Sequence, residues 1–171
     1  MQIKPTLLLL AFTIGCSSTT YNFQRNIEEL SYREKRNAKR CIESKGYKLK
    51  EKAKILRVET VPGQRRFPRG WAWQEPALGN MWVHGLFWDR RNGRYLIQVA
   101  ANPRTGEEVS AGTLQHEMGH FWLVSNHNIY HHDPTFDSCF AGWRGADVRA
   151  NTILLEDGSI VIINYIDVDE D

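Results

Sequence analysis

The chain has 171 residues, of which 42% are hydrophobic and 25% are charged, and its formal net charge is +2. This composition excludes an intrinsically disordered chain, and the length favours one domain with a single modest core. Residues 21–70 hold fifteen Lys or Arg against six Glu. Because the two signs are mixed along an expected helix and strand, we predict a solvated surface there and no nucleic-acid partner.

Residues 1–15 have the pattern of an export signal. A short positive start that includes Lys4 precedes an apolar segment over residues 7–14, which is too short to span a bilayer comfortably. The end of the signal resembles that of bacterial lipoproteins, in which Cys16 would carry the lipid and become the first mature residue. We therefore expect an exported, lipid-anchored protein of the bacterial cell envelope, at the outer membrane or cell surface. A conventional cleaved signal and an uncleaved anchor are the alternatives.

After a polar tether over residues 16–21, residues 22–171 are expected to form a single domain. It begins with a helix over residues 22–45, where apolar residues recur at near-helical spacing before Gly46. Residues 48–61 alternate loosely and predict a strand. The next segment, residues 64–80, is dense in Pro, Gly and Arg, which predicts a long loop.

Two strands are expected next, over residues 81–89 and 94–101. They flank the turn Arg90-Arg91-Asn92-Gly93, whose Asn-Gly pair suits the positive φ angles of a tight hairpin. Four Trp residues lie in or near these segments. We expect them to belong to the core, with a place in a substrate cleft as the alternative. They are Trp71, Trp73, Trp82 and Trp88.

A second helix is predicted over residues 110–125, with Ser110 as its N-cap. A polar loop is expected to follow as far as residue 137, and residues 152–155 and 160–166 predict a C-terminal hairpin. The predicted fold class is therefore α+β. A small antiparallel or mixed sheet would pack against the 110–125 helix, with an N-terminal helix and a C-terminal hairpin beside them.

Cys41 and Cys139 are the two cysteines that follow the signal. An even pair in an exported protein suggests a disulfide, here between the first helix and the segment after the second. Closing so long a loop would stabilise the fold by roughly 4 kcal/mol. Two unrelated buried thiols are the alternative, and neither cysteine has the paired spacing of a zinc knuckle.

The 110–125 helix contains the sequence His116-Glu117-Met118-Gly119-His120. Because His116 and His120 are four residues apart, their imidazoles lie on one helical face and can meet one tetrahedral metal ion. Glu117 is rotated from that face and can act as general base on a metal-bound water. Gly119 costs about 1 kcal/mol relative to Ala inside a helix, so it predicts close packing against a neighbouring element.

A catalytic zinc site needs a third protein ligand and an open position. The candidates lie in the loop after the helix. They are His127, His131, His132, Asp133 and Asp137.

His132 begins the segment His132-Asp133-Pro134-Thr135-Phe136, about a dozen residues after His120. Residues 110–136 thereby resemble SprT-like minimal zinc proteases and related small zincins, which combine His-Glu-x-x-His with a later His-x-x-x-Phe/Trp segment. The resemblance implies a zincin-like metallopeptidase with Zn²⁺ as cofactor and a peptide or protein as substrate. The roles that it implies are metal ligation by His116, His120 and His132, and general base catalysis by Glu117. As third ligand we therefore rank His132 first, His127 second and His131 third, before Asp133 or Asp137.

Two further expectations follow from this resemblance. Phe136 would pack beneath the loop and hold the third ligand, and residues 95–100 would offer a strand edge to an extended peptide. The alternative hypothesis is a non-catalytic lipoprotein that binds metal or serves as an interaction module of the cell envelope. Glu117 favours the enzyme, because metal binding alone does not require a base beside the ligands.

Overall fold

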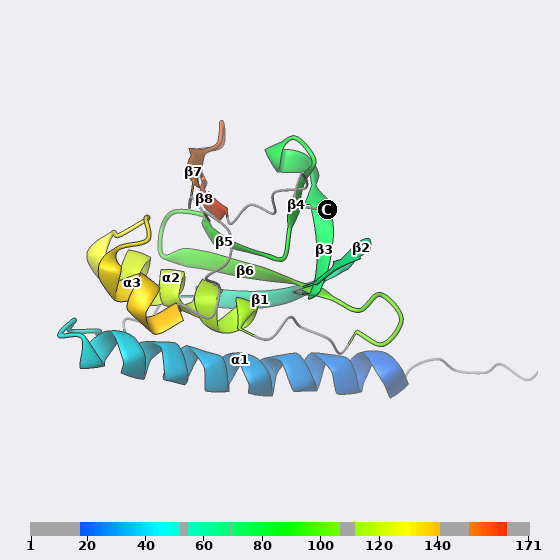
Figure 1. Ribbon diagram of the computed structural model, residues 1–171, viewed down its shortest axis with the longest axis horizontal. Coiled ribbons are helices and arrows are strands. Elements are labelled where there is room, and N and C mark those ends of the chain that lie inside the picture. The colour runs from blue at the N-terminus through cyan, green and yellow to red at the C-terminus, as the bar shows by residue number, and fades with distance from the viewer. Residues whose placement is uncertain (1–17, 52–54, 69, 107–111, 141–150, 164–171) are drawn as a thin grey trace, which may run out of the picture.

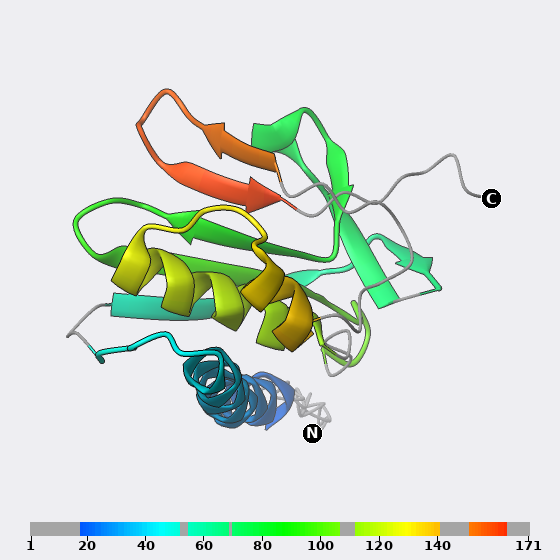
Figure 2. The same ribbon diagram turned by 60° about the vertical axis from the view of Figure 1, so that its left-hand side comes forward.

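The computed structural model describes residues 18–51, 55–68, 70–106, 112–140 and 151–163, and the expected signal and Cys16 lie outside these ranges. The described residues form an α+β fold, as predicted, in which a mixed sheet lies between helices and a smaller sheet (Figures 1 and 2). The elements are, in chain order, α1 (Ser18–Ser44), β1 (Ile55–Pro62), β2 (Arg65–Phe67), β3 (Gly70–Glu75), a 3-10 helix η1 (Pro76–Leu78), β4 (Met81–Val83), β5 (Gly85–Asp89), β6 (Arg94–Ala101), α2 (Thr113–His127), α3 (Pro134–Phe140), β7 (Asn151–Leu154) and β8 (Ile160–Ile163).

The main sheet has five strands in the order β1-β6-β5-β8-β7. β6 pairs with β1 in parallel and with β5 in antiparallel orientation, so that Ile97 lies opposite both Val58 and Phe87. β8 continues the sheet beyond β5 and forms the predicted C-terminal hairpin with β7. The expectation that residues 95–100 offer a free edge is therefore wrong, since β6 is hydrogen-bonded on both sides.

Helix α2 lies on one face of the main sheet, against β5 and β6, and α1 packs beside α2 and β1 (Figure 2). The indole Nε1 of Trp122 donates to the Lys35 carbonyl at 2.8 Å, which joins the two helices. Ser110, the predicted N-cap, lies outside the described residues; α2 begins at Thr113, and its N-cap is Gly112, in the left-handed region at φ 89°. Asn128, also left-handed, ends the helix. Burial between a sheet and a helix explains why α2 is apolar on more than one face.

Two apolar cores lie on opposite faces of the main sheet, because successive strand residues point to opposite sides. The core on the α2 side is built on Phe87, Ile97 and Ile162. The core on the other side lies beneath the small sheet and includes Trp73 and Trp88, which are 3% and 7% exposed. The expectation of a core position is correct for these two Trp residues, whereas Trp71 and Trp82 are half-buried.

The predicted loop over residues 64–80 is wrong, because most of it is ordered as β2, β3 and η1. β3 pairs with β2 on one side and with β4 on the other. Residues 81–89, predicted as one strand, divide at His84 between the small sheet and the main sheet. The backbone N–H and C=O groups of this Pro- and Gly-rich segment are hydrogen-bonded to neighbouring strands. Such pairing cannot be predicted from local composition.

Helix α1 begins at Ser18 and thus takes up part of the segment expected as a tether over residues 16–21. It ends one residue before the predicted limit, and Gly46 follows with φ 97°. Among the described residues, no helix is both long and apolar enough to cross a membrane. Helix α3 lies in the stretch predicted as a loop, which corrects that prediction.

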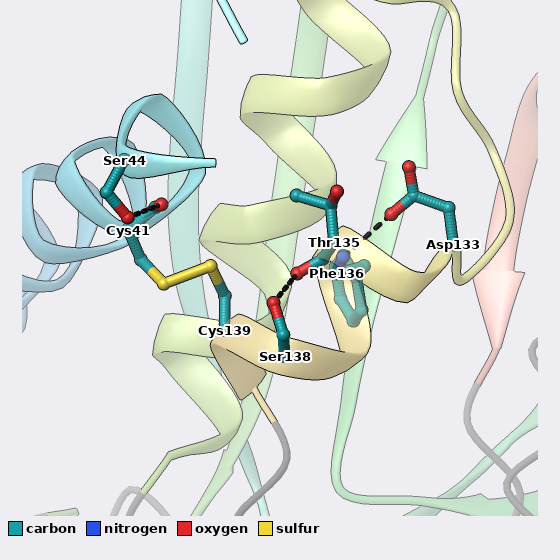
Figure 3. Close-up of a disulfide and its surroundings, with 7 residues drawn as sticks. All are labelled: Cys41, Ser44, Asp133, Thr135, Phe136, Ser138 and Cys139. Atoms are coloured by element: carbon teal, nitrogen blue, oxygen red, sulfur yellow. Dashed lines mark hydrogen bonds between the residues drawn. A yellow bond between two sulfur atoms is a disulfide. The ribbon is translucent and has the colours of Figure 1, made fainter. Parts of the chain in front are cut away.

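The disulfide between Cys41 and Cys139 is present, as predicted, and it joins α1 to α3 across a sequence separation of 98 residues (Figure 3). Its closing of such a long loop restricts the unfolded chain far more than the folded one. The disulfide therefore fixes the position of a short helix against the longest helix of the fold.

Replacing Cys41 and Cys139 together by serine should lower the free energy of unfolding by roughly 4 kcal/mol, because the unfolded chain regains the entropy of a long open loop. Denaturant titrations of the oxidised wild type and of the double variant measure this difference. A loss below about 1 kcal/mol would contradict the expected contribution of the cross-link.

Candidate metal centre

Three histidine side chains converge at the boundary between α2 and the start of α3. His116 and His120 lie one turn apart on α2, and their Nε2 atoms are 3.2 Å apart. The Nε2 atom of His132, from the segment just before α3, lies 3.3 Å from Nε2 of His120. Each of the three offers one ligand atom, and these atoms all lie within 4.8 Å of one another, so the three residues could hold a metal ion.

The spacing of these nitrogens fits a tetrahedral metal ion. At a Zn–N distance of about 2.05 Å, tetrahedral geometry separates two ligand nitrogens by about 3.3 Å. The two Nε2 separations in the structure are 3.2 and 3.3 Å. Converging imidazole lone pairs repel one another unless a proton or a cation lies between them, so a cation stabilises this arrangement. Such a nitrogen donor set suits zinc and also several other divalent transition metals.

The histidines are held in the neutral form that binds metals. Complete burial lowers the pKa of His120 well below its usual 6.5, and the neighbouring His116 and His132 add to this effect. Burial also lowers the pKa of His132, while the carboxylate of Asp137 acts in the opposite direction. At neutral pH, both side chains therefore present an unprotonated nitrogen.

Phe136 of α3 is the surface on which the three imidazoles rest. Its ring stacks on His132 at 4.3 Å and on His120 at 4.4 Å between centroids, and it meets the His116 ring edge-on at 4.7 Å. The expectation that Phe136 packs beneath the third histidine is confirmed. A shift of α3 would therefore disturb the orientation of all three rings.

Gly119 allows α3 to approach α2 closely, as predicted from its place in the helix. A Cβ atom added at Gly119 would overlap the ring of Phe140 and would lie 3.0 Å from Cε2 of Phe136. The absent side chain thus makes room for the aromatic rings that support the histidines.

Glu117 lies on a different side of α2 from the histidines' aromatic support and faces the beginning of β5. It is 1% exposed. A Cβ atom added at Gly85 would lie 3.0 Å from Glu117 Oε1 and 2.5 Å from Thr113 Cγ2. The glycine thereby leaves the carboxylate space in a buried position next to the ligand helix.

The alternative third ligands lie outside the cluster. His127 and His131 are both exposed, and the His127 ring packs edge-on against Tyr47 at 5.1 Å. Asp133 has a structural role instead: Oδ1 accepts from the Phe136 N–H at 2.7 Å, and Oδ2 accepts from Tyr47 Oη at 2.6 Å. Asp137 Oδ1 lies 4.0 Å from His132 Nδ1, the ring nitrogen that points away from the cluster.

The sequence around Asp133 indicates the start of a helix, although a loop was predicted there. Asp133 precedes Pro134, and an N-cap residue followed by Pro at the first helical position is typical of a helix start. Helix α3, and with it the support of the third histidine, was therefore accessible to sequence analysis.

Two hydrogen bonds fasten the segment that leads to His132. Tyr130 Oη donates to Asp89 Oδ2 of β5 at 2.7 Å, and Thr152 Oγ1 of β7 donates to the Tyr130 carbonyl at 2.9 Å. The position of the third histidine thus depends on β5, β7 and α3, whereas the first two are positioned by α2 and share only the contact with Phe136 of α3.

Comparison with known proteins identifies no relative. No family model matches the chain, and no curated protein or solved structure is significantly similar to it.

Stability of the metal-free protein should fall as the pH drops below about 6.5, the ordinary pKa of a histidine. The unfolded chain takes up a proton at His120 in this range, whereas the folded chain resists it because the pKa of His120 is lowered. Urea titrations between pH 7 and pH 5 measure the slope. A His120→Asn variant should show a smaller slope, and a variant of the exposed His127 should keep it; equal slopes in all three would contradict the assignment.

Gly119→Ala should destabilise the protein, although alanine favours helices by about 1 kcal/mol over glycine. The added methyl group overlaps Phe140 and crowds Phe136, and overpacking of this kind costs roughly 1–3 kcal/mol. Thermal unfolding and zinc titration should both register the change. A variant of equal or higher stability with unchanged metal binding would show that α3 does not depend on this contact.

Proposed function

We propose that this protein is a zinc-dependent metallopeptidase or amidase that acts on peptide bonds outside the cytoplasm. The observation that carries the proposal is the convergence of three histidine Nε2 atoms at 3.2 and 3.3 Å, the spacing of tetrahedral zinc ligands. A glutamate follows the first ligand directly in the sequence. Pure metal storage does not require such a carboxylate.

In this proposal, His116, His120 and His132 hold the metal through Nε2. Zinc, when bound, is a Lewis acid that lowers the pKa of a coordinated water toward neutrality. Glu117 accepts the proton of the attacking water and delivers it to the amine that leaves. Because Glu117 is almost completely buried, its carboxylate acts in surroundings where electrostatic interactions are stronger than in water.

The proposed substrate is a peptide or protein, on the resemblance of residues 110–136 to small zincins. Strand addition at residues 95–100 is not part of the proposal, because β6 is paired with β1 and β5. The beginning of β5 borders Glu117 through Gly85.

The proposed location is the bacterial cell envelope, with a lipid on Cys16 as the membrane attachment. The disulfide between Cys41 and Cys139 supports export, because disulfides form and persist mainly in oxidising compartments. No nucleic-acid partner is proposed.

The second candidate is a metal-binding envelope protein without catalytic activity. The observation that favours it is the burial of the site: His116, Glu117 and His120 are 3%, 1% and 0% exposed. A catalytic zinc ion needs an open position for water and substrate, whereas a structural one is enclosed.

Zinc content and peptide hydrolysis, measured together, separate the two candidates. Wild type and Glu117→Gln should each bind one zinc ion per chain, whereas His116→Ala and His132→Ala should lose it. Hydrolysis of a mixed peptide library should fall by about 10²–10⁴ in Glu117→Gln, the usual contribution of a general base. His127→Ala is the matched control, since this exposed histidine lies outside the cluster.

Each outcome points to one candidate. Stoichiometric zinc with hydrolysis that depends on Glu117 supports the peptidase. Stoichiometric zinc without hydrolysis in any variant supports the non-catalytic protein. A wild type that binds no zinc, or His132→Ala with full zinc affinity, contradicts the assigned ligand set.

A further inference from the structure

The disulfide connects the end of α1 to the short helix on which the three histidines rest (Figure 3). We propose that this disulfide is an oxidation-dependent lock on the metal site, which reaches its full zinc affinity only when Cys41 and Cys139 are joined. The inference rests on the proposed metal site and adds its regulation.

Helix α3 has seven residues, and isolated helices shorter than about 12 residues are marginal in water. Its position must therefore come from tertiary contacts. Asp133 caps its first turn through the Phe136 N–H, and the rings of Phe136 and Phe140 lie against Gly119 of α2. Cys139 lies almost at the end of the helix, where it is bonded to α1.

The cross-link lies close to the metal ligands along the chain. Cys139 follows Phe136 by three residues, which is nearly one helical turn, so the disulfide and the aromatic ring move together. Phe136 contacts His132, His120 and His116 at centroid distances between 4.3 and 4.7 Å. A displacement of α3 from α1 therefore changes the support of every ligand and the position of His132 in particular.

On the other side, α1 provides a fixed point. Ala38 and Ile42, on either side of Cys41, are both 0% exposed. The hydrogen bond from Trp122 Nε1 to the Lys35 carbonyl also joins α1 to the ligand helix. The hydrogen bond from Tyr47 Oη to Asp133 Oδ2 at 2.6 Å adds a link between the segment after α1 and the start of α3. The disulfide thus connects the well-packed helix α1 to α3, which is too short to be stable by itself.

The redox step is an ordinary thiol–disulfide exchange. Both cysteines are half-buried, so a small thiol or a thiol–disulfide oxidoreductase can reach them. Formation of the bond removes two electrons and two protons from the two Sγ–H groups, and the disulfide of the oxidant becomes two thiols. A chain in a reducing compartment would therefore hold zinc weakly, and oxidation would complete the site.

The test is the zinc dissociation constant, measured by competition with a chromogenic chelator. The oxidised wild type is compared with the Cys41→Ser, Cys139→Ser double variant, which cannot bind zinc through free thiols. We expect binding at least about tenfold weaker in the double variant, the lower end of the effect of losing a group that orients a ligand. The matched control is Leu78→Ala, which removes a buried side chain from the core on the opposite face of the sheet; it should lower stability and leave zinc affinity unchanged.

Linkage gives a second measurement on the wild type. If the disulfide strengthens zinc binding, zinc must make the disulfide harder to reduce by the same factor. Equilibration in glutathione buffers, with thiols counted by alkylation, measures the reduced fraction with and without zinc. A reduction equilibrium that zinc does not shift would overturn the lock.

The failure of this inference differs from failure of the proposed function. Equal dissociation constants in wild type and double variant would overturn the lock and leave the metal site intact. Absence of stoichiometric zinc from the oxidised wild type would overturn both. If circular dichroism shows that the double variant is unfolded, the glutathione equilibrium of the wild type decides instead, since it needs no variant; a reduced fraction that zinc does not shift would overturn the lock.

Discussion

Three histidine side chains whose ligand atoms lie within 4.8 Å of one another, in a largely buried place, are the constraint on which the rest of the structure depends. His120 is fully buried, and burial lowers its pKa and keeps it neutral. Neutral imidazoles whose lone pairs converge do not attract each other, so the surrounding fold must hold them together. Much of the architecture around α2 serves this purpose: a sheet on one side, α1 beside the helix, and α3 beneath the rings.

Two of the clustered histidines and the third are held in different ways. His116 and His120 need only a helix, because a four-residue spacing brings them together on one face. His132 needs several elements that are distant in sequence. Tyr130 fastens its segment to β5 and β7. Asp133 fastens the start of the following helix to Tyr47, and Cys139 fastens that helix to α1. His132 is consequently the member of the cluster most sensitive to tertiary contacts.

Small residues around α2 are as informative as the ligands. Gly119 lets Phe136 and Phe140 approach the ligand helix, and Gly85 leaves space for the Glu117 carboxylate beside β5. Both glycines act through close approach between elements. They lie on different sides of α2, so one supports the metal ligands and the other supports the proposed general base.

Local patterns in the sequence were enough for much of the fold. Helical spacing located α1 and α2, and turn residues located both hairpins of the main sheet. The residue spacing of His116, Glu117 and His120, and the packing role of Gly119, also follow from helix geometry alone. The disulfide followed from cysteine count and an expected oxidising compartment. In each case the interacting residues are close together in the sequence, or, as for the cysteines, very few partners are available.

The tertiary structure alone decided the features that depend on distant partners. Residues 64–80 become strands because β3 pairs with β2 and β4, although their composition is that of a loop. β6 is an interior strand because it pairs with β1 on one side and β5 on the other, so a peptide cannot add to it as a further strand. His132, and neither His127 nor His131, joins the cluster because α3 packs against Gly119 and places Phe136 beneath the imidazoles. The sequence by itself determined which side chains could bind a metal; their meeting required backbone pairing and ring packing between segments far apart in the chain, which no local pattern records.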